Sequence, residues 1–231
     1  MKTLLSNITL CITFILMLTA CSKENGCRYD AGTIIWTKSH IDDIKTMNRT
    51  RWLNIDTLSY QISAYSEFSA SQRMNLWTEK LSEALQLDWF QKERMHIVRM
   101  IYYIDNNPQW FNGNLPNDKK EYDYFKLITT QWKSFAKDSL NWNDKQIAAL
   151  INSPFPLDGQ DGAIKLPVNM RDDPGEGDAN DEEVGGRLKC NCNRSNYELT
   201  CAHVCNPTYV CSGHTFICGI LWGENCNGIC E

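Results

Sequence analysis

Cysteine is concentrated near the C-terminal end of this chain. Eight of the eleven cysteines lie within residues 190–231, with the spacing C-x-C-x8-C-x3-C-x5-C-x6-C-x7-C-x3-C. Because a segment of about 40 residues buries too little apolar surface to fold alone, cross-links or a metal ion must stabilise it. An even number of cysteines in an exported chain favours disulfides. The eight are Cys190, Cys192, Cys201, Cys205, Cys211, Cys218, Cys226 and Cys230.

A zinc site is the alternative that these cysteines raise. The sequence CAHVC at residues 201–205, with His214 nearby, contains metal-ligating side chains. Structural zinc sites usually combine two closely spaced ligand pairs, whereas the spacings here are irregular. Export also places thiols where they oxidise. We therefore predict disulfides and no metal ion, and the spacing does not decide which cysteines pair.

The N-terminus has the pattern of a secretory signal peptide. Lys2 precedes an apolar run that ends in LTAC at residues 18–21. The run is shorter and more polar than a permanent membrane span, which needs about 20 mostly apolar residues. Its last four residues resemble the bacterial lipobox, in which the cysteine after the cleavage site becomes the lipidated first residue. An ordinary cleaved signal peptide is the alternative.

The lipobox resemblance implies an anchored protein. It assigns residues 1–20 to a lipoprotein signal peptide, lipidation with palmitate to Cys21, and a short tether to residues 21–30. The expected partner is then the membrane, through the lipid, and the expected location is the bacterial cell envelope, at the outer membrane. Cys11 leaves with the signal peptide, so Cys27 is the one cysteine outside the C-terminal set. It is either free or paired between molecules.

Residues 31–156 are predicted to form an all-α helical domain of about four helices. Apolar residues recur there at intervals of three and four, which places them on one face of each helix. Ser69 with Gln72 and Asn143 with Gln146 match capping boxes at two helix starts. We interpret the apolar stripes, aromatic residues included, as core packing. They are Met74, Trp77, Leu81, Ala84 and Leu85; Ile97, Ile101 and Ile104; Tyr122, Phe125, Ile128, Trp132 and Phe135; and Ile147, Leu150 and Ile151.

The beginning of this domain is ambiguous. Residues 33–37 (TIIWT) suit a short strand, whereas residues 41–47 suit a helical turn. Neither segment is long enough for its spacing to decide the matter.

A polar, acidic segment separates the helical domain from the cysteines. Residues 157–187 are rich in Gly, Asp and Glu, with seven acidic residues within residues 169–186. This composition predicts a flexible, self-repelling linker, so residues 188–231 form a separate, irregular, disulfide-rich module. Candidate processing sites at the end of the linker are Gly185, Gly186, Arg187 and Lys189. The preferred interpretation of the Gly185-Gly186 pair is a hinge.

One apolar run interrupts the polar tail. Residues 216–222 read FICGILW. A module held by cross-links can leave such residues exposed, and exposed apolar groups usually mark a contact with a partner or a membrane. The alternative is that they form the small core of the module. The candidate contact residues are Phe216, Ile217, Ile220, Leu221 and Trp222.

Charge and motif content argue against two classes of function. The net charge is −5, and there is no basic stripe with interleaved aromatic residues, which argues against nucleic-acid binding. Metalloprotease, nucleophile-elbow, phosphate-loop and dinucleotide-binding motifs are missing from the sequence. We therefore predict that the protein is not an enzyme and needs no cofactor.

The lipobox, the helical middle and the terminal eight-cysteine module together resemble the bacteriocin fulvocin C-related proteins. The resemblance in the tail covers the eight cysteines and the sequence GILW at residues 219–222, under a fifth of the chain. It implies an exported, lipid-anchored precursor or carrier of a disulfide-rich peptide. That peptide, displayed or released extracellularly, would act on the envelope or a surface receptor of competing bacteria. The tail from Arg187 onward has no net charge, unlike many cationic membrane-active bacteriocins.

Two other interpretations compete with this one. The first is a non-toxic surface lipoprotein whose cross-linked module binds a glycan or a protein partner, with the tail permanently attached to its anchor. The second is an envelope enzyme or zinc protein, which requires free thiols or bound metal.

Overall fold

The computed structural model describes residues 31–113, 115–165, 205–206, 216–225 and 229–230. Within these ranges the chain forms eight α-helices, which confirms the predicted all-α class. The predicted number of about four helices is too low, because four further helices precede residue 70. They are α2 (Ala31–Ser39), α3 (Ile41–Lys45), α4 (Arg49–Leu53), α5 (Leu58–Glu67), α6 (Ala70–Ala84), α7 (Gln91–Asp105), α8 (Lys119–Leu140) and α9 (Asp144–Ile151). Two 3-10 helices, η1 (Pro108–Phe111) and η2 (Leu115–Asn117), lie between α7 and α8.

The described part of the tail contains only short elements. β1 (Cys205–Asn206) pairs antiparallel with β4 (Ile229–Cys230), and β2 (Phe216–Cys218) pairs antiparallel with β3 (Glu224–Asn225). One turn of 3-10 helix, η3 (Ile220–Trp222), lies between β2 and β3. The rest of the predicted module, and with it the predicted disulfide bonding, lies outside the described residues.

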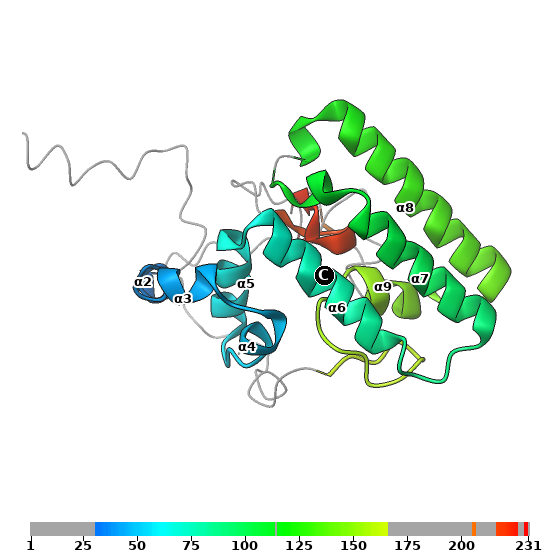
Figure 1. Ribbon diagram of the computed structural model, residues 1–231, viewed down its shortest axis with the longest axis horizontal. Coiled ribbons are helices and arrows are strands. Elements are labelled where there is room, and N and C mark those ends of the chain that lie inside the picture. The colour runs from blue at the N-terminus through cyan, green and yellow to red at the C-terminus, as the bar shows by residue number, and fades with distance from the viewer. Residues whose placement is uncertain (1–30, 114, 166–204, 207–215, 226–228, 231) are drawn as a thin grey trace, which may run out of the picture.

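The four helices predicted from apolar spacing are α6 to α9. Both predicted capping boxes are present: Ser69 and Gln72 begin α6, and Asn143 and Gln146 begin α9. Figure 1 shows α6, α7 and α8 side by side. The predicted stripes supply much of the core between them. Their fully buried members are Trp77, Leu81, Ile97, Ile104, Phe125, Ile147, Leu150 and Ile151.

A reciprocal pair of hydrogen bonds joins α7 to α8. His96 Nε2 donates to the Trp132 carbonyl oxygen at 3.0 Å, and Trp132 Nε1 donates to the His96 carbonyl oxygen at 2.9 Å. The two rings stack with their centroids 4.4 Å apart. Burial lowers the pKa of His96 to about 4, so the ring is neutral at physiological pH. His96 therefore serves as a packing residue.

The strand considered for residues 33–37 is wrong, because this segment belongs to α2. Thr33 and Thr37 lie one helical turn apart on the side that faces α5. Thr33 Oγ1 donates to Ser59 Oγ at 3.3 Å, and the hydroxyl oxygens of Thr37 and Ser63 lie 2.6 Å apart. These contacts outweigh the strand preference of β-branched residues, which depends strongly on context. α3 confirms the helical turn predicted to follow.

Residues 157–165, which the sequence assigns to the flexible linker, instead pack on the helical domain. Leu157 and Ile164 form an antiparallel bridge, and Leu157 is buried. Gln146 Nε2 donates to the Gln160 carbonyl oxygen at 2.8 Å. The apolar pair and this bond hold the turn against α9, so the predicted boundary at residue 157 is too early. The remainder of the linker lies outside the described residues.

Candidate functional site

The candidate site is the place where η3 enters the helical domain. Ile220 and Leu221 are 2% and 1% exposed, and Trp222 packs against the same core. Figure 1 shows this C-terminal segment, in red, between α5 and α9. We call the helical-domain residues that bond or stack with η3 the docking site. They are Trp52, Tyr65, Trp77 and Asn152.

Trp222 sits edge-on to three aromatic rings from three different helices. Its ring centroid lies 4.9 Å from that of Tyr65, 6.1 Å from that of Trp52 and 6.4 Å from that of Trp77. The interplanar angles are 85°, 77° and 80°, which is the edge-to-face arrangement that aromatic pairs prefer. Its indole nitrogen donates to the Asn152 carbonyl oxygen at 2.9 Å. The site therefore provides aromatic contacts for the Trp222 ring and a hydrogen-bond acceptor for its N–H group.

The hydroxyl of Tyr65 links the tail to the domain. It lies 3.5 Å from the Leu221 carbonyl oxygen, to which it donates, and it accepts a hydrogen bond from Trp77 Nε1 at 3.3 Å. Burial raises the pKa of Tyr65 to about 12, against the opposing effects of the Trp77 bond and the Arg73 charge. The hydroxyl therefore keeps its proton at physiological pH and remains a donor.

The backbone of η3 is strained. Gly219 has φ 70° and ψ −158°, a region that is nearly restricted to glycine. Leu221 and Trp222 have φ values of 53° and 50°, in the left-handed region. That conformation costs an L-residue about 1–2 kcal/mol. Contacts of the docked side chains must offset this cost, so the conformation of η3 depends on the docking site.

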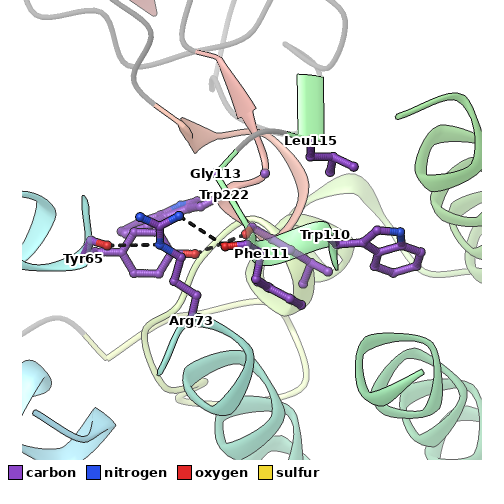
Figure 2. Close-up of a pocket in the computed structure, with 9 residues that line it drawn as sticks. Tyr65, Arg73, Trp110, Phe111, Gly113, Leu115 and Trp222 are labelled. Atoms are coloured by element: carbon purple, nitrogen blue, oxygen red, sulfur yellow. Dashed lines mark hydrogen bonds between the residues drawn. The ribbon is translucent and has the colours of Figure 1, made fainter. Parts of the chain in front are cut away.

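Arg73 fixes the segments beside the docking site. It donates to the carbonyl oxygens of Tyr65, Ser66 and Phe111 at 3.3, 2.7 and 3.3 Å. Figure 2 shows its guanidinium between Tyr65 and Phe111. The small pocket drawn there has a volume of about 10 Å³, enough for one water molecule. It is a packing gap at the edge of the docked segment, too small to hold a substrate.

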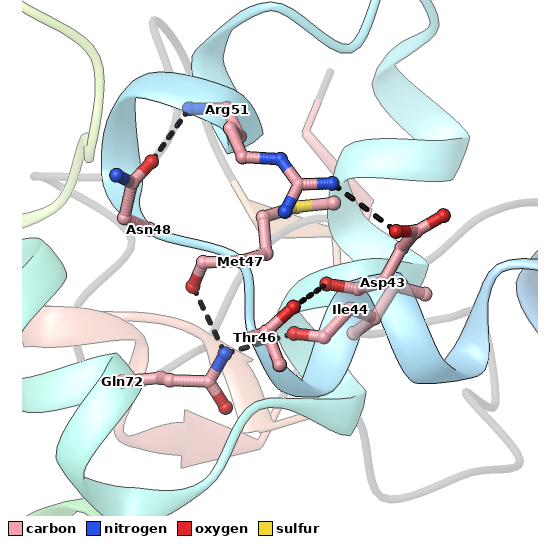
Figure 3. A network of polar contacts seen from close by, with 7 residues as sticks. All are labelled: Asp43, Ile44, Thr46, Met47, Asn48, Arg51 and Gln72. Atoms are coloured by element: carbon pink, nitrogen blue, oxygen red, sulfur yellow. Dashed lines mark hydrogen bonds and ion pairs between the residues drawn. The ribbon is translucent and has the colours of Figure 1, made fainter.

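Gln72 holds the beginning of α6, the helix that carries Trp77. Its side-chain nitrogen donates to the carbonyl oxygens of Ile44 and Met47 at 2.8 and 3.0 Å (Figure 3). Its side-chain oxygen accepts from the Ser69 N–H at 3.0 Å. One amide therefore caps the start of α6 and bonds one carbonyl in the last turn of α3 and another just after that helix, which fixes the two helices relative to each other.

Lys80 positions the end of α9. Its side chain is 1% exposed, and Nζ donates to the carbonyl oxygens of Ala149 and Leu150. Carbonyls in the last turn of a helix have no partner within the helix, so the lysine supplies one. Burial lowers the pKa of Lys80 well below its usual value. Because Asn152 ends the same helix, Lys80 also places the acceptor that Trp222 uses.

The structure corrects the predicted contact surface. Ile220 and Leu221 are buried and Trp222 is partly buried, so these three residues do not form an exposed patch. They pack in the core of the helical domain, because rings from α4, α5 and α6 complement them. The side chains of Phe216 and Ile217 lie outside the described residues.

Most other predicted site residues also lie outside the described residues and stay predictions. They are Cys21, Cys27, Gly185, Gly186, Arg187, Lys189, Cys190, Cys192, Cys201, Cys211 and Cys226. Of Cys205, Cys218 and Cys230 the backbone alone is described; β1 and β4 pair Cys205 with Cys230.

The apolar spacing predicts Trp77 as a core residue, whereas the sequence does not single out Trp52, Tyr65, Lys80 and Asn152. A signal existed for Lys80, which lies three residues after Trp77 and four before Ala84 on the apolar face of α6. The other three had none, because their partners lie in the tail, far along the chain.

Within the described ranges, no group of three or more His, Cys, Asp or Glu side chains is arranged to hold a metal ion. None of the helices there combines the length and apolar character that a membrane span requires. No family model, curated protein or solved structure matches the chain.

Proposed function

We propose that this protein is an exported, lipid-anchored carrier of a disulfide-rich bacteriocin-like peptide, whose helical domain shields the apolar segment of that peptide. The proposal is supported by one observation above all: the Ile220–Trp222 segment is buried in the docking site. This is the part of the tail with the apolar character that a contact with a competitor's envelope requires.

The burial has an energetic consequence for exposure of the segment. Covering one large apolar side chain stabilises a protein by about 1.5–3 kcal/mol, as an upper estimate. Two such side chains, Ile220 and Leu221, are covered here and Trp222 is partly covered, and the bonds to Asn152 and Tyr65 add to this burial. Undocking the segment into water therefore costs free energy. The carrier keeps the segment inactive until contacts with a membrane or a receptor replace those of the docking site.

The anchor and the release step come from the sequence. Lipidation at Cys21 would hold the carrier on the cell envelope, at the outer membrane, with Cys27 free or paired between molecules. Cleavage near Gly185-Gly186, Arg187 or Lys189 would remove the covalent link between the peptide and the carrier, which leaves the docking contacts as their only attachment. The protein acts by binding in this scheme, without catalysis or a cofactor.

A second candidate function is a surface lipoprotein whose cross-linked module binds a glycan or a protein. The bond from Tyr65 to the Leu221 carbonyl oxygen supports it, because a fixed tail would present the rest of the module in one orientation. In this case the docked segment is a permanent attachment point and the tail is never released.

A killing assay separates the two functions. The oxidised chain (residues 22–231) is cut at a site inserted in the linker, and the tail is then separated from the helical domain in urea without reductant, so that its native cross-links are kept. We expect this tail to inhibit related bacteria, the uncut chain to be inactive at equal concentration, and the reduced and alkylated tail to be inactive. Absence of inhibition at any dose of the oxidised tail would contradict the carrier function and favour the binding module.

A further inference from the structure

Residues 28–189, which include the helical domain and most of the linker, cannot form a disulfide bond with the tail. No cysteine occurs between Cys27 and Cys190. Apart from Cys27, the attachment of the tail therefore consists of the linker backbone and the docking contacts. The docking contacts join side chains and backbone groups of the helical domain to those of the Ile220–Trp222 segment. None of these contacts involves a linker residue.

The docking site is fixed by bonds made within the helical domain. Trp52 Nε1 donates to the Gln61 carbonyl oxygen at 2.8 Å, and Gln61 Nε2 returns a bond to the Trp52 carbonyl oxygen at 3.1 Å. The Trp77 indole bonds the Tyr65 hydroxyl, and the Arg73 guanidinium lies 5.5 Å from the Tyr65 ring centroid. A site held in this way loses little conformational entropy when it binds its segment, which favours association without a covalent link.

The fit also discriminates between segments. Beside Trp222, a Cβ atom at Gly223 would lie 3.4 Å from both the Ile220 carbonyl oxygen and a methyl group of Leu115, close enough to leave little room for a larger side chain. Gly219 needs a backbone conformation that other residues avoid. The order Gly-Ile-Leu-Trp-Gly is therefore matched to this site by shape as well as by apolar character.

We infer that the helical domain is a receptor for the Ile220–Trp222 segment, and that the covalent linker is not needed for binding. A tail cut within the linker stays bound to its own domain, and a vacant docking site captures the tail of a second copy. This inference deepens the proposed function: if the tail is toxic, anchored domains retain and neutralise it at the surface of the producing cell. The binding itself does not depend on toxicity.

Retention after cleavage tests the first half of the inference. A protease recognition sequence is inserted between Asp178 and Ala179 of the oxidised chain, with Cys27→Ser to remove the odd thiol. After cutting, size-exclusion chromatography with intact mass spectrometry should find both fragments together. Trp222→Ala should raise the freely eluting fraction of the tail at least tenfold, and Tyr65→Phe several-fold, whereas Phe90→Ala, whose ring is 80% exposed, should change nothing. Release of the tail from the cut parent chain, or equal retention in Trp222→Ala, would overturn the inference.

Capture in trans tests the second half. The uncut Trp222→Ala and Leu221→Asp chains each have a vacated docking site. They are mixed with fluorescently labelled tail that has been separated from the cut parent chain in urea without reductant and then returned to buffer. Fluorescence anisotropy should show binding at least tenfold tighter than to the uncut parent chain, whose site is occupied. Equal binding by all three chains, or none by either variant, would contradict capture. If the tail is retained and captured but does not inhibit bacteria, the receptor inference holds and the proposed bacteriocin function fails. If the tail inhibits bacteria but is not retained, the proposed function holds and the receptor inference fails.

Discussion

The indole N–H of Trp222 donates to the carbonyl oxygen of Asn152 at 2.9 Å, across 70 positions of the chain. Asn152 ends α9, the last helix of the domain, and Lys80 bonds the two carbonyls of Ala149 and Leu150 in the same turn. The tail therefore docks on a helix end that a buried lysine already fixes to α6. Through this contact, the stability of the helical domain and the exposure of the tail depend on each other.

Trp222→Ala should destabilise the helical domain, although the residue lies in the tail. It removes a ring packed edge-on to three others and one partly buried hydrogen bond, so we expect a loss of about 3 kcal/mol in the free energy of unfolding. Urea denaturation of the oxidised chain, followed by far-ultraviolet circular dichroism, measures it. The matched control is Phe90→Ala, which removes an exposed ring and should stay within about 0.5 kcal/mol of the parent. Identical midpoints for both variants would contradict docking.

Tyr65→Phe should cost about 1–2 kcal/mol, because it removes the donor to Leu221 and the acceptor for Trp77. Tyr102→Phe, on an exposed ring, is the control. Alkaline pH gives a second readout. Tyrosine titrates near pH 10 when unfolded and Tyr65 at about 12 when folded, so the folded state holds more protons between these values. Stability should fall as pH rises from 10 to 12, and less steeply in Tyr65→Phe than in the control.

His96 should make the domain sensitive to acid. Its Nε2 bonds the Trp132 carbonyl oxygen, and its Nδ1 has no hydrogen-bond partner within the described residues, so a second ring proton would be buried without an acceptor. Its pKa is about 4, against 6.5 in an unfolded chain, so the unfolded state binds more protons in this window. Stability should fall by up to about 3 kcal/mol as pH drops from 6.5 to 4. His96→Phe should flatten that part of the stability profile; parallel profiles would refute the assignment.

Lys80→Ala should lower the free energy of unfolding by about 2–4 kcal/mol. It leaves the Ala149 and Leu150 carbonyls unpaired and opens a cavity between α6 and α9. Because Asn152 is on the same helix end, the cut chain should also release its tail more readily. Lys120→Ala, which truncates an exposed lysine of α8, should leave both measurements unchanged. A stable Lys80→Ala protein with normal retention would show that Lys80 does not position the docking site.

Local patterns predicted the elements that depend on local contacts. The capping boxes of Ser69 and Asn143 and the stripes of α6 to α9 are visible in the sequence because their partners lie three or four residues away. The helix at residues 31–39 is not visible in the sequence, because hydroxyl groups of α5, and not neighbouring residues, stabilise its threonines. The turn at residues 157–165 is not predicted for a different reason: its polar composition conceals one apolar bridge, between Leu157 and Ile164.

The docking site could not be predicted from the sequence, because its contacts join residues that are far apart in the chain. The run of residues 216–222 is unusual for a polar tail, but its apolar character does not say whether water, a membrane or another part of the chain covers it. Trp52 and Tyr65 face Trp222 because α4 and α5 fold beside α6, and no spacing rule connects residues more than 150 positions apart. An apolar run in a tail therefore indicates a contact without identifying its partner.

The most direct test of the account is the proximity of Trp222 to Tyr65 in solution. Their ring centroids are 4.9 Å apart, so nuclear Overhauser spectra of the oxidised chain (residues 22–231) should contain strong cross-peaks between their ring protons. The Trp222 indole N–H should also be protected from exchange by its bond to Asn152. Absence of cross-peaks from Trp222 to Tyr65, Trp52 and Trp77, together with rapid exchange of that N–H, would contradict the docked tail.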